Sequence, residues 1–375
     1  MVRSGNDLGF AHPVRKIAVV RANGIGDYLF AVPALRALRA RFAQAELVLL
    51  GKQWHRDLLT GRPGPIDRVE VIPRCRGVGA ETDDTDDHDG LERFFAAMAS
   101  ERFDLAIQLH GGGRYSNPFT RRLRARFAIG LKSPDAEALD AWIPYFYFQP
   151  EVLRYIEVMS LVGAAPVTVE PDFAVMPADD AEVDRLQLPD DRPWVVLHPG
   201  ATDGRRLWPA THFAAVADYL VDNGARVIVS GGESERRIVD AVVGAMRREA
   251  IALCQRLSLG GLAALLARSH VVISNDSGPL HLAGAVGART VGLYWCINFA
   301  NGGPVTRARH HPLISWRVHC PVCGRNTLND NCAHHDSFIA EIPVADVQQA
   351  AVTLLADAKR EHLRAAQRGR NATRA

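Results

Sequence analysis

Residues 275–281 read NDSGPLH and stand between an apolar run, Val271–Ile273, and a segment rich in Ala and Leu, 280–287. This order predicts a buried strand, a polar corner and then a helix. Pro is tolerated in a first helical turn because its missing N–H would have no partner there, and the Asp or Ser before it can cap the helix. The free N–H groups and the dipole of such a helix start attract anions. We therefore expect a phosphate at this corner, where Gly278 lets it approach the backbone; the alternative is a corner that only connects two elements.

Strands and helices are expected to alternate twice along the chain. Short apolar runs indicate buried strands, at residues 16–21, 46–50, 68–72 and 104–109 and then at 194–197, 226–229, 251–253, 271–274 and 290–294. Helical spacing of apolar residues indicates helices over 29–42, 211–222, 234–248 and 261–268. This alternation predicts an α/β fold with two mostly parallel sheets, each covered on both faces. Ligands of such sheets bind beyond the carboxyl ends of the strands, which predicts a site in a cleft between two domains.

The length of 375 residues favours two domains over one. We place the boundary in a proline-rich stretch, residues 166–193, and expect units at 1–175 and 176–345. A C-terminal helix and tail, 346–375, complete the chain. The helix is expected to pack on the first domain.

Composition narrows the class of protein. Hydrophobic residues make up 47% and charged residues 23% of the chain, as in ordinary soluble proteins, and a net charge of +2 gives no reason to expect nucleic acid. No run of 18 apolar residues exists, and Met1–Pro13 lacks the apolar core of a signal peptide. We therefore expect a cytoplasmic protein. Its six cysteines argue against a disulfide framework.

The first strand-to-helix corner, residues 21–27, reads RANGIGD. A dinucleotide site would need a third glycine at position 29 and an acid after the second strand, where the chain has Leu29 and a Gly-Lys pair. An NAD-linked oxidoreductase therefore keeps little support. What remains is Asp27 on the tip of a glycine-rich turn, where it can accept a proton from an attacking hydroxyl. The alternative is that Asp27 simply caps a helix beginning at Tyr28.

Two further motifs follow strands of the second half. Residues 198–209 contain HPGA and RRLWP, and the guanidiniums of Arg205 and Arg206 can neutralise a diphosphate with paired donors, or merely be exposed in a loop. Residues 230–233 read SGGE. Glu233 is positioned to bind a ribose or a base, or is an acid favoured by the dipole of a helix start.

In this order and spacing the motifs resemble glycosyltransferase family 9, the bacterial ADP-heptose heptosyltransferases of lipopolysaccharide core assembly. The resemblance spans about residues 15–347 and rests on Gly26-Asp27 with Pro33, and on residues 198–201, 206–209, 231–233, 276–281 and 285–287. It implies a GT-B architecture of two Rossmann-like domains around a central cleft, with the acceptor on the N-terminal and the donor on the C-terminal domain. It also implies inverting transfer of a sugar, heptose from ADP-heptose, from a nucleotide-diphospho-sugar to a hydroxyl of a saccharide or protein acceptor. No metal cofactor is implied for catalysis.

The resemblance also implies roles for individual residues. Asp27 corresponds to the general base, and Ser277 and Gly278 to the phosphate-binding residues. The expected donor-binding set is Gly26, His198, Gly200, Arg205, Arg206, Gly232, Glu233, Asp276, Ser277, Gly278 and His281. For His281 the alternative is an ordinary histidine satisfied by contacts at a helix start. The chain departs from the family in carrying Arg206 where relatives commonly have Lys, and Trp295 where glycine often follows an aromatic, which leaves the donor's identity open.

Residues 114–127 contain five arginines and three aromatics. We interpret them as a surface for an anionic saccharide or protein acceptor at the inner face of the bacterial inner membrane, with which the protein makes peripheral contact. The alternative is a solvated helix face. One basic patch without overall basicity does not indicate nucleic acid.

A cysteine knuckle near residues 320–335 has the character of a metal site. Cys320, Cys323, Cys332 and His334 could complete a tetrahedral shell around a structural zinc, remote from the chemistry. Autotransporter heptosyltransferases, relatives within the family, carry a cysteine-ligated iron near this region, so zinc and iron both stay open. The other interpretation is buried thiols or a disulfide. A third function class also remains, a non-catalytic sugar-nucleotide-binding scaffold that uses this knuckle for docking.

Overall fold

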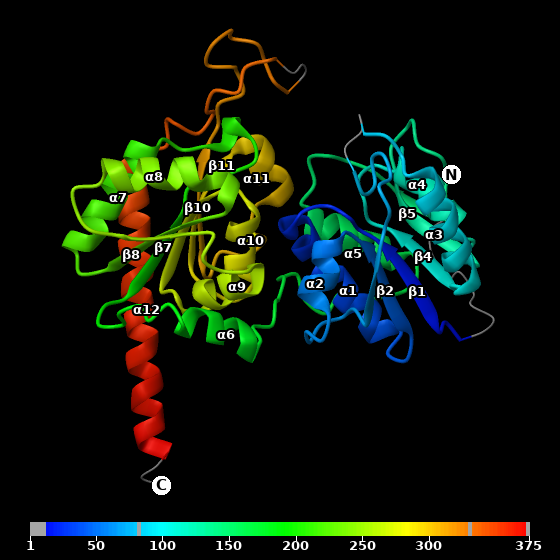
Figure 1. Cartoon of the computed structure of the whole chain (residues 1–375), viewed down its shortest axis with the longest axis horizontal. Helices are drawn as coiled ribbons and strands as arrows, with labels where there is room; N and C mark the ends of the chain where they lie inside the picture. Colours follow the sequence, from blue (N-terminus) through cyan, green and yellow to red (C-terminus); the bar gives the residue numbers. More distant parts are fainter. Residues whose placement is uncertain (1–12, 81–83, 329–331, 373–375) are drawn as a thin grey trace. The chain divides into compact units, whose positions relative to one another are not determined.

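The computed structural model describes residues 13–80, 84–328 and 332–372. The chain divides into two compact units, Met1–Ala174 and Val175–Ala375, each built on one six-stranded sheet (Figure 1). The boundary lies inside the proline-rich stretch assigned to a linker. Part of that stretch is structured, because its helix α6, Pro177–Asp184, packs on helix α9, Leu259–Arg268, within the second unit.

The sheet of the first unit has six parallel strands in the order β3-β2-β1-β4-β5-β6. The strands are β1 Lys16–Val20, β2 Glu46–Gly51, β3 Arg68–Val71, β4 Leu105–Gln108, β5 Phe127–Lys132 and β6 Ala141–Pro144. The helices are α1 Ile25–Arg41, α2 Gln53–Leu59, α3 His88–Ser100, α4 Ser116–Arg122 and α5 Glu151–Ser160. The four predicted strands are confirmed. Strands β5 and β6 were not predicted, because β5 begins in the arginine-rich segment and β6 buries only one of its four residues.

The second sheet repeats this arrangement, with the order β12-β11-β10-β7-β8-β9 and all pairs parallel. The strands are β7 Trp194–His198, β8 Arg226–Gly231, β9 Ile251–Cys254, β10 Val271–Asn275, β11 Thr290–Trp295 and β12 His310–Ser315. The helices after α6 are α7 Ala210–Asp222, α8 Arg236–Ala245, α9, α10 Gly278–Ala285, α11 Cys296–Gly302 and α12 Val344–Ala372. Two parallel sheets with helices between their strands confirm the predicted α/β fold. Edge strand β12 was missed because it is polar and only partly buried.

Each sheet reverses its direction of growth at one point. The chain adds β2 and β3 on one side of β1 and then crosses to β4 on the other side; β7 and β10 have the same relation in the second sheet. The loops after β1 and β4, and after β7 and β10, therefore diverge from neighbouring strand ends. Open α/β sheets bind their ligands in that crevice. The corners singled out in the sequence lie after β1, β7 and β10, at these two switch points.

The last helix, α12, packs on the second unit. Its buried residues Val347, Ala350, Ala351 and Leu354 are spaced as one helical face and join the core of that unit's sheet and α7. The prediction that this helix packs on the first domain is wrong, because its apolar stripe completes the core of the second. Among the described residues, no helix is long and apolar enough to cross a membrane.

Candidate functional site

Asp27 lies at the switch point of the first sheet, in the first turn of α1. The helix begins at Ile25, three residues earlier than expected. Oδ2 of Asp27 accepts a hydrogen bond from the Gly24 N–H at 3.0 Å, so the residue does cap the helix start. Its side chain nevertheless stays 39% exposed. Because one carboxylate both caps and faces solvent, the two interpretations of Asp27 are compatible. Gly26, expected to bind the donor, is buried beside it in the same turn.

A buried arginine, Arg21, contacts Asp27 from the interior of the first unit. Arg21, only 2% exposed, donates from Nε to the Asp27 carbonyl (3.0 Å) and from one terminal nitrogen to the Leu109 carbonyl (2.7 Å). Its other terminal nitrogen lies 3.0 Å from Oδ1 of Asp27 and 2.8 Å from Oε2 of Glu151. Arg21 belongs to the motif of residues 21–27 but had no predicted role. Glu151 was not predicted, because no local pattern connects it to a corner 130 residues away.

Two buried histidines complete the surroundings of this corner. Burial and the charge of Arg21 lower the pKa of both His55 and His110 to about 3, and Lys52 adds to this effect. Nδ1 of His110 accepts the Ala22 N–H at 3.2 Å, which joins the loops after β4 and β1 across the switch point. Both rings are therefore neutral at physiological pH, and the half-exposed basic group of the corner is Asp27.

In the second unit the loops after β7 and β10 meet through a buried ion network. One terminal nitrogen of Arg206 donates to the Asp276 carbonyl (3.1 Å) and lies 3.4 Å from Oδ2 of the same residue. Nε2 of His281 lies 3.1 Å from Oδ1 of Asp276. Burial alone would raise the pKa of Asp276, but His281 and Arg206 outweigh burial and hold the pKa below its ordinary value. His281 thus has a partner, as its alternative interpretation required, and that partner belongs to the predicted site.

The start of α10 lies beside this network. Ser277 occupies the N-cap position with no side-chain hydrogen bond to the helix, and Gly278 and Pro279 begin the first turn. The side chain of Asn275 fixes the corner. Its Nδ2 donates to the Pro199 carbonyl at 2.7 Å, and its Oδ1 accepts the backbone N–H of Trp208 at 3.2 Å. A helix start held in place beside a guanidinium suits a phosphate group.

A second polar group lies at the carboxyl ends of β7 and β8. His198 lies with Nδ1 3.1 Å from Oγ of Ser230 and Nε2 3.3 Å from Oε2 of Glu235. The same carboxylate oxygen accepts the Gly232 N–H at 2.7 Å. Burial alone would raise the pKa of Glu235, but His198 and this N–H bring it below the ordinary value. A Cβ at Gly200 would lie 1.9 Å from the Glu235 carboxylate, so the absence of a side chain there makes room for it.

Two predicted donor residues have other partners. Glu233 is exposed and pairs with Arg236 at 3.0 Å, whereas Glu235, which the sequence analysis missed, points at His198. Arg205 pairs with Asp203 at 2.7 Å and does not share the carboxylate that Arg206 faces. Arg206 is therefore the cation that contacts the residue before the start of α10, whereas Arg205 pairs with Asp203.

A cavity of about 350 Å³ adjoins the second polar group. It is lined by four leucines and by polar residues that include Ser230, Glu235 and Ser258, and Pro279 of α10 also lines it. The leucines are Leu253, Leu257, Leu259 and Leu262. Volume and lining fit a flat apolar ring attached to a polar sugar, because ligand pockets begin at about 300 Å³.

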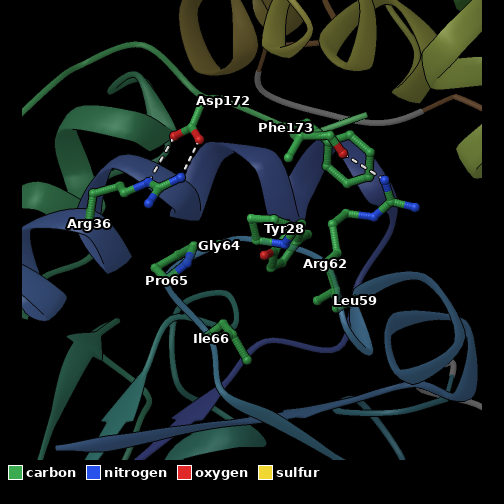
Figure 2. A pocket seen from close by; sticks show the side chains of 11 residues that line it. Tyr28, Arg36, Leu59, Arg62, Gly64, Pro65, Ile66, Asp172 and Phe173 are labelled. Atoms are coloured by element: carbon green, nitrogen blue, oxygen red, sulfur yellow. Dashed lines mark hydrogen bonds and ion pairs between the residues drawn. The ribbon is translucent and has the colours of Figure 1, made fainter. Parts of the chain in front are cut away.

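A smaller pocket in the first unit, of about 20 Å³, has a structural role (Figure 2). Arg36 forms paired interactions with the Asp172 carboxylate, and Arg62 donates to the Ala174 carbonyl at 2.6 Å. Tyr28 also lines it. The space is large enough for about one water molecule. These contacts fasten the last residues of the first unit to α1 and to the segment after α2.

The arginine-rich segment is largely compensated by acids. Arg121 pairs with Asp140 at 2.8 Å and Arg122 with Glu92 at 2.6 Å. Its interpretation as a surface for an anionic acceptor stays a prediction.

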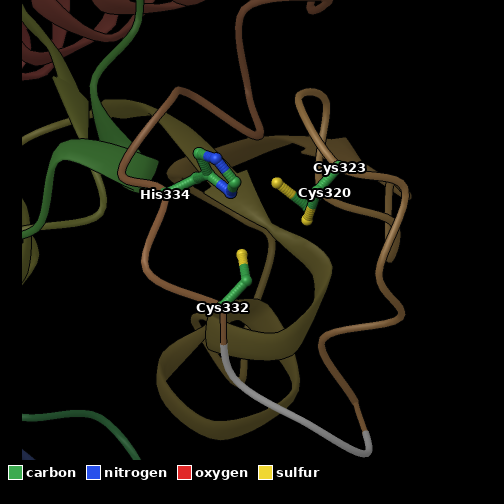
Figure 3. Close-up of side chains that lie close together, drawn as sticks. All are labelled: Cys320, Cys323, Cys332 and His334. Carbon is green, nitrogen blue, oxygen red and sulfur yellow. The ribbon is translucent and has the colours of Figure 1, made fainter.

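The cysteine knuckle does bring its four predicted ligands together (Figure 3). One ligand atom each from Cys320, Cys323, Cys332 and His334 lies within 4.8 Å of all the others. Backbone N–H groups of Cys323 and Val322 lower the pKa of the Cys320 thiol to about 7 although burial opposes this. Nδ1 of His334 is buried and has no hydrogen-bond partner among the described residues. The cluster can therefore hold a metal ion.

Comparisons with known proteins identify the family of the chain. Residues 91–320 match the family model for glycosyltransferase family 9 (heptosyltransferase), which is more than half of the chain; Asp27 precedes the matched segment. Lipopolysaccharide heptosyltransferase 2 of Escherichia coli K12 is 26% identical over 296 residues, which cover 74% of this chain and 82% of that protein.

Two solved structures share the fold. That of E. coli ADP-heptose lipopolysaccharide heptosyltransferase II covers 92% of this chain and 99% of its own, with a TM-score of 0.72 and 18% identity. The structure of the iron-containing dodecameric glycosyltransferase TibC from enterotoxigenic E. coli H10407 covers 91% of this chain and 76% of its own, with a TM-score of 0.53 and 14% identity. The predicted pair of Rossmann-like units is thus confirmed, and neither rival class gains support. The chain belongs to glycosyltransferase family 9, the heptosyltransferase family.

Proposed function

We propose that this protein transfers heptose from ADP-heptose to a hydroxyl of a saccharide acceptor, with inversion at the anomeric carbon, in the synthesis of lipopolysaccharide. The sugar, the nucleotide and the product class follow the names of the related proteins. The observation that carries the proposal is Asp27, an accessible carboxylate at the switch point of the first sheet.

In this proposal Asp27 is the general base. The acceptor hydroxyl gives its proton to the Asp27 carboxylate while its oxygen attacks the anomeric carbon. The bond between that carbon and the diphosphate oxygen breaks, and ADP leaves with the electron pair. A positioned base contributes about 10²–10⁴-fold to such a step. Because His55 and His110 are neutral, the charged side chains in contact at this corner are Asp27, Arg21 and Glu151.

The second unit binds the donor in this proposal. Arg206 and the N–H groups at the start of α10 hold the diphosphate and stabilise the charge that it gains as the bond breaks. The cavity beside His198 takes the nucleoside, with the base against the leucines and the ribose hydroxyls toward Glu235 and Ser230.

A donor screen tests this assignment. Purified protein is incubated with ADP-heptose and, in parallel, with GDP- and UDP-sugars, together with a heptose-free lipopolysaccharide core acceptor. Release of ADP coupled to a heptosylated product is expected. Transfer from another donor alone, or to a protein acceptor alone, would contradict the named substrates. Tight donor binding without transfer or hydrolysis would favour the non-catalytic scaffold.

We also propose that the cysteine knuckle holds a structural metal ion. Three thiolates and one imidazole are the ligand set of tetrahedral zinc sites, and TibC is an iron-containing relative in fold, so zinc and iron are the two candidates. The ion would cross-link residues 320–334, and none of these four side chains belongs to the donor site described above.

Metal analysis and a paired substitution test this second proposal. Protein purified without added chelator should contain about one zinc or iron per chain. Cys332→Ser should lose the ion and lower the melting temperature, whereas Cys75→Ser, at a partly buried cysteine outside the cluster, should keep it. A substoichiometric trace of metal in the wild type, or equal metal in both variants, would refute the site.

For peripheral membrane contact we propose the loop after β6. Phe146, Tyr147 and Phe148 are 62%, 41% and 46% exposed, and aromatic rings favour the membrane–water interface. Flotation with anionic phospholipid vesicles should recover the wild type and not a Phe146→Ser, Phe148→Ser variant. Equal recovery of the two proteins would contradict this contact.

A further inference from the structure

Glu151 connects the proposed base to the interior of the first unit. It is the first residue of α5, and its side chain is 11% exposed. Its carboxylate lies between two buried guanidiniums, with Oε2 2.8 Å from Arg21 and Oε1 3.3 Å from Arg154, and Oε2 also accepts the Tyr155 hydroxyl at 2.9 Å. We propose that Glu151 is a positioning residue of the transfer reaction, which holds Arg21 so that the guanidinium orients Asp27 without capturing it.

The geometry supports this role because one nitrogen of Arg21 serves both carboxylates. Nε and the other terminal nitrogen are bound to backbone carbonyls, which fixes the plane of the guanidinium. The remaining nitrogen is shared between Glu151 at 2.8 Å and Asp27 at 3.0 Å. If Glu151 lost its charge, Asp27 would be the one carboxylate left to balance the positive charge of Arg21 through this nitrogen. The guanidinium would then stabilise the ionised form of Asp27 more strongly, and the carboxylate would accept the acceptor's proton less readily.

Charge balance leads to the same conclusion. Arg21 and Arg154 are buried cations, and Glu151 is the buried anion between them. Burying an ion pair is costly and by itself is weak evidence for a gain in stability. Here the buried ions are connected through Arg21 to the accessible carboxylate of Asp27. Arg154 also donates to the Tyr147 and Gln149 carbonyls (2.8 and 2.7 Å), so it anchors the loop before α5.

The other groups near Asp27 do not replace Glu151. His55 on α2 and His110 after β4 are neutral, and Lys52 before α2 adds positive charge. Tyr155 of α5 keeps its proton, because burial raises the pKa of its hydroxyl well above the usual range. Among these groups Glu151 alone is an anion that competes with Asp27 for Arg21.

The inference rests on the proposed role of Asp27 and is tested by the pH dependence of transfer. With Glu151→Gln, the acid limb of kcat/KM should move to lower pH by about one unit, since a nearby opposite charge shifts a carboxyl by about 1–3 units. At neutral pH kcat should fall roughly tenfold, because a weaker base takes up the proton less well. Affinity for ADP, measured by calorimetry, should not change.

Controls separate positioning from folding. Glu157→Gln makes the same change at an exposed position of α5 and should leave the pH profile unchanged. Glu151→Asp restores the charge with a shorter side chain and should give a profile between those of Gln and wild type, which keeps the test decisive if the Gln variant does not fold. An acid limb that stays in place in both Glu151 variants would overturn the inference. If Asp27→Asn retained full turnover, the proposed function itself would fail, whatever the Glu151 variants showed.

Discussion

Replacing Arg206 and Arg205 separately by Met tests the proposed diphosphate site. Both guanidiniums were expected to neutralise the diphosphate, but in the structure they have different partners. Arg206 faces the Asp276 carboxylate and the start of α10, and its side chain is 20% exposed. Arg205 is bound by Asp203 through three contacts of 2.7–3.0 Å and lies over the Trp295 ring. Met keeps much of the side-chain volume and removes only the charge and the donors.

The expected magnitude follows from the kind of bond that is lost. A hydrogen bond to a charged group contributes about 1.5–3 kcal/mol, so losing one from Arg206 to a phosphate should weaken ADP binding about 10- to 150-fold. Arg205 is already neutralised, so Arg205→Met should change the dissociation constant less than about threefold. Arg206→Lys keeps the positive charge but loses the paired donors, and it should fall between Met and wild type.

Isothermal titration calorimetry of ADP measures these differences directly, at low and at physiological salt. The loss in Arg206→Met should shrink as salt screens the interaction in the wild type. Equal losses in the two Met variants would mean that both guanidiniums meet the diphosphate, as first expected from the sequence. An unchanged affinity in Arg206→Met would remove Arg206 from the donor site.

Two further predictions concern the second unit. Trp208 is fully buried, and its Nε1 donates to the Ile342 carbonyl at 3.1 Å, so Trp208→Ala should cost about 3–5 kcal/mol in urea unfolding, and a loss below about 1 kcal/mol would contradict its place in the core. The depressed pKa of Asp276 contributes stability that is present above its unfolded-state pKa and is lost as the pH falls below about 4. Asp276→Asn should therefore flatten the acid limb of the unfolding free energy against pH, and an equally steep limb would show that other carboxylates cause it.

The corners of the fold could be predicted from the sequence because their signals are local. Gly, Asp, Ser and Pro between an apolar run and a helical pattern predicted the corners after β1 and β10, where the structure places Asp27 in the first turn of α1 and Ser277 at the N-cap of α10. The missed strands are β5 and the edge strand β6 of the first sheet and the edge strand β12 of the second. Strands β6 and β12 bury few residues. Strands β6 and β12 therefore lack the buried apolar runs that identified the inner strands, whereas β5 buries four of its six residues and was missed because it begins in the arginine-rich segment.

Partners distant in the chain could not be predicted. Glu151 reaches Arg21 only because α5 packs beside α1, and no pattern within the motif indicates this. Glu235 lies beside His198 because a short 3₁₀ turn, Glu233–Glu235, directs its side chain inward, and no pattern in the SGGE motif indicated this contact. The apolar face of α12 is visible in the sequence, but the unit whose core it would complete could not be predicted from the sequence.

The most direct test of the central claim compares transfer by Asp27→Asn with transfer by Asp89→Asn. Both replace an acid in the first turn of a helix, and Asp89 is an exposed residue of α3 far along the chain from the corner. With saturating ADP-heptose and acceptor, Asp27→Asn should lower turnover at least about a hundredfold while the affinity for ADP stays the same, and Asp89→Asn should match the wild type. Turnover in Asp27→Asn within a fewfold of the wild type would contradict the assignment of Asp27 as the base.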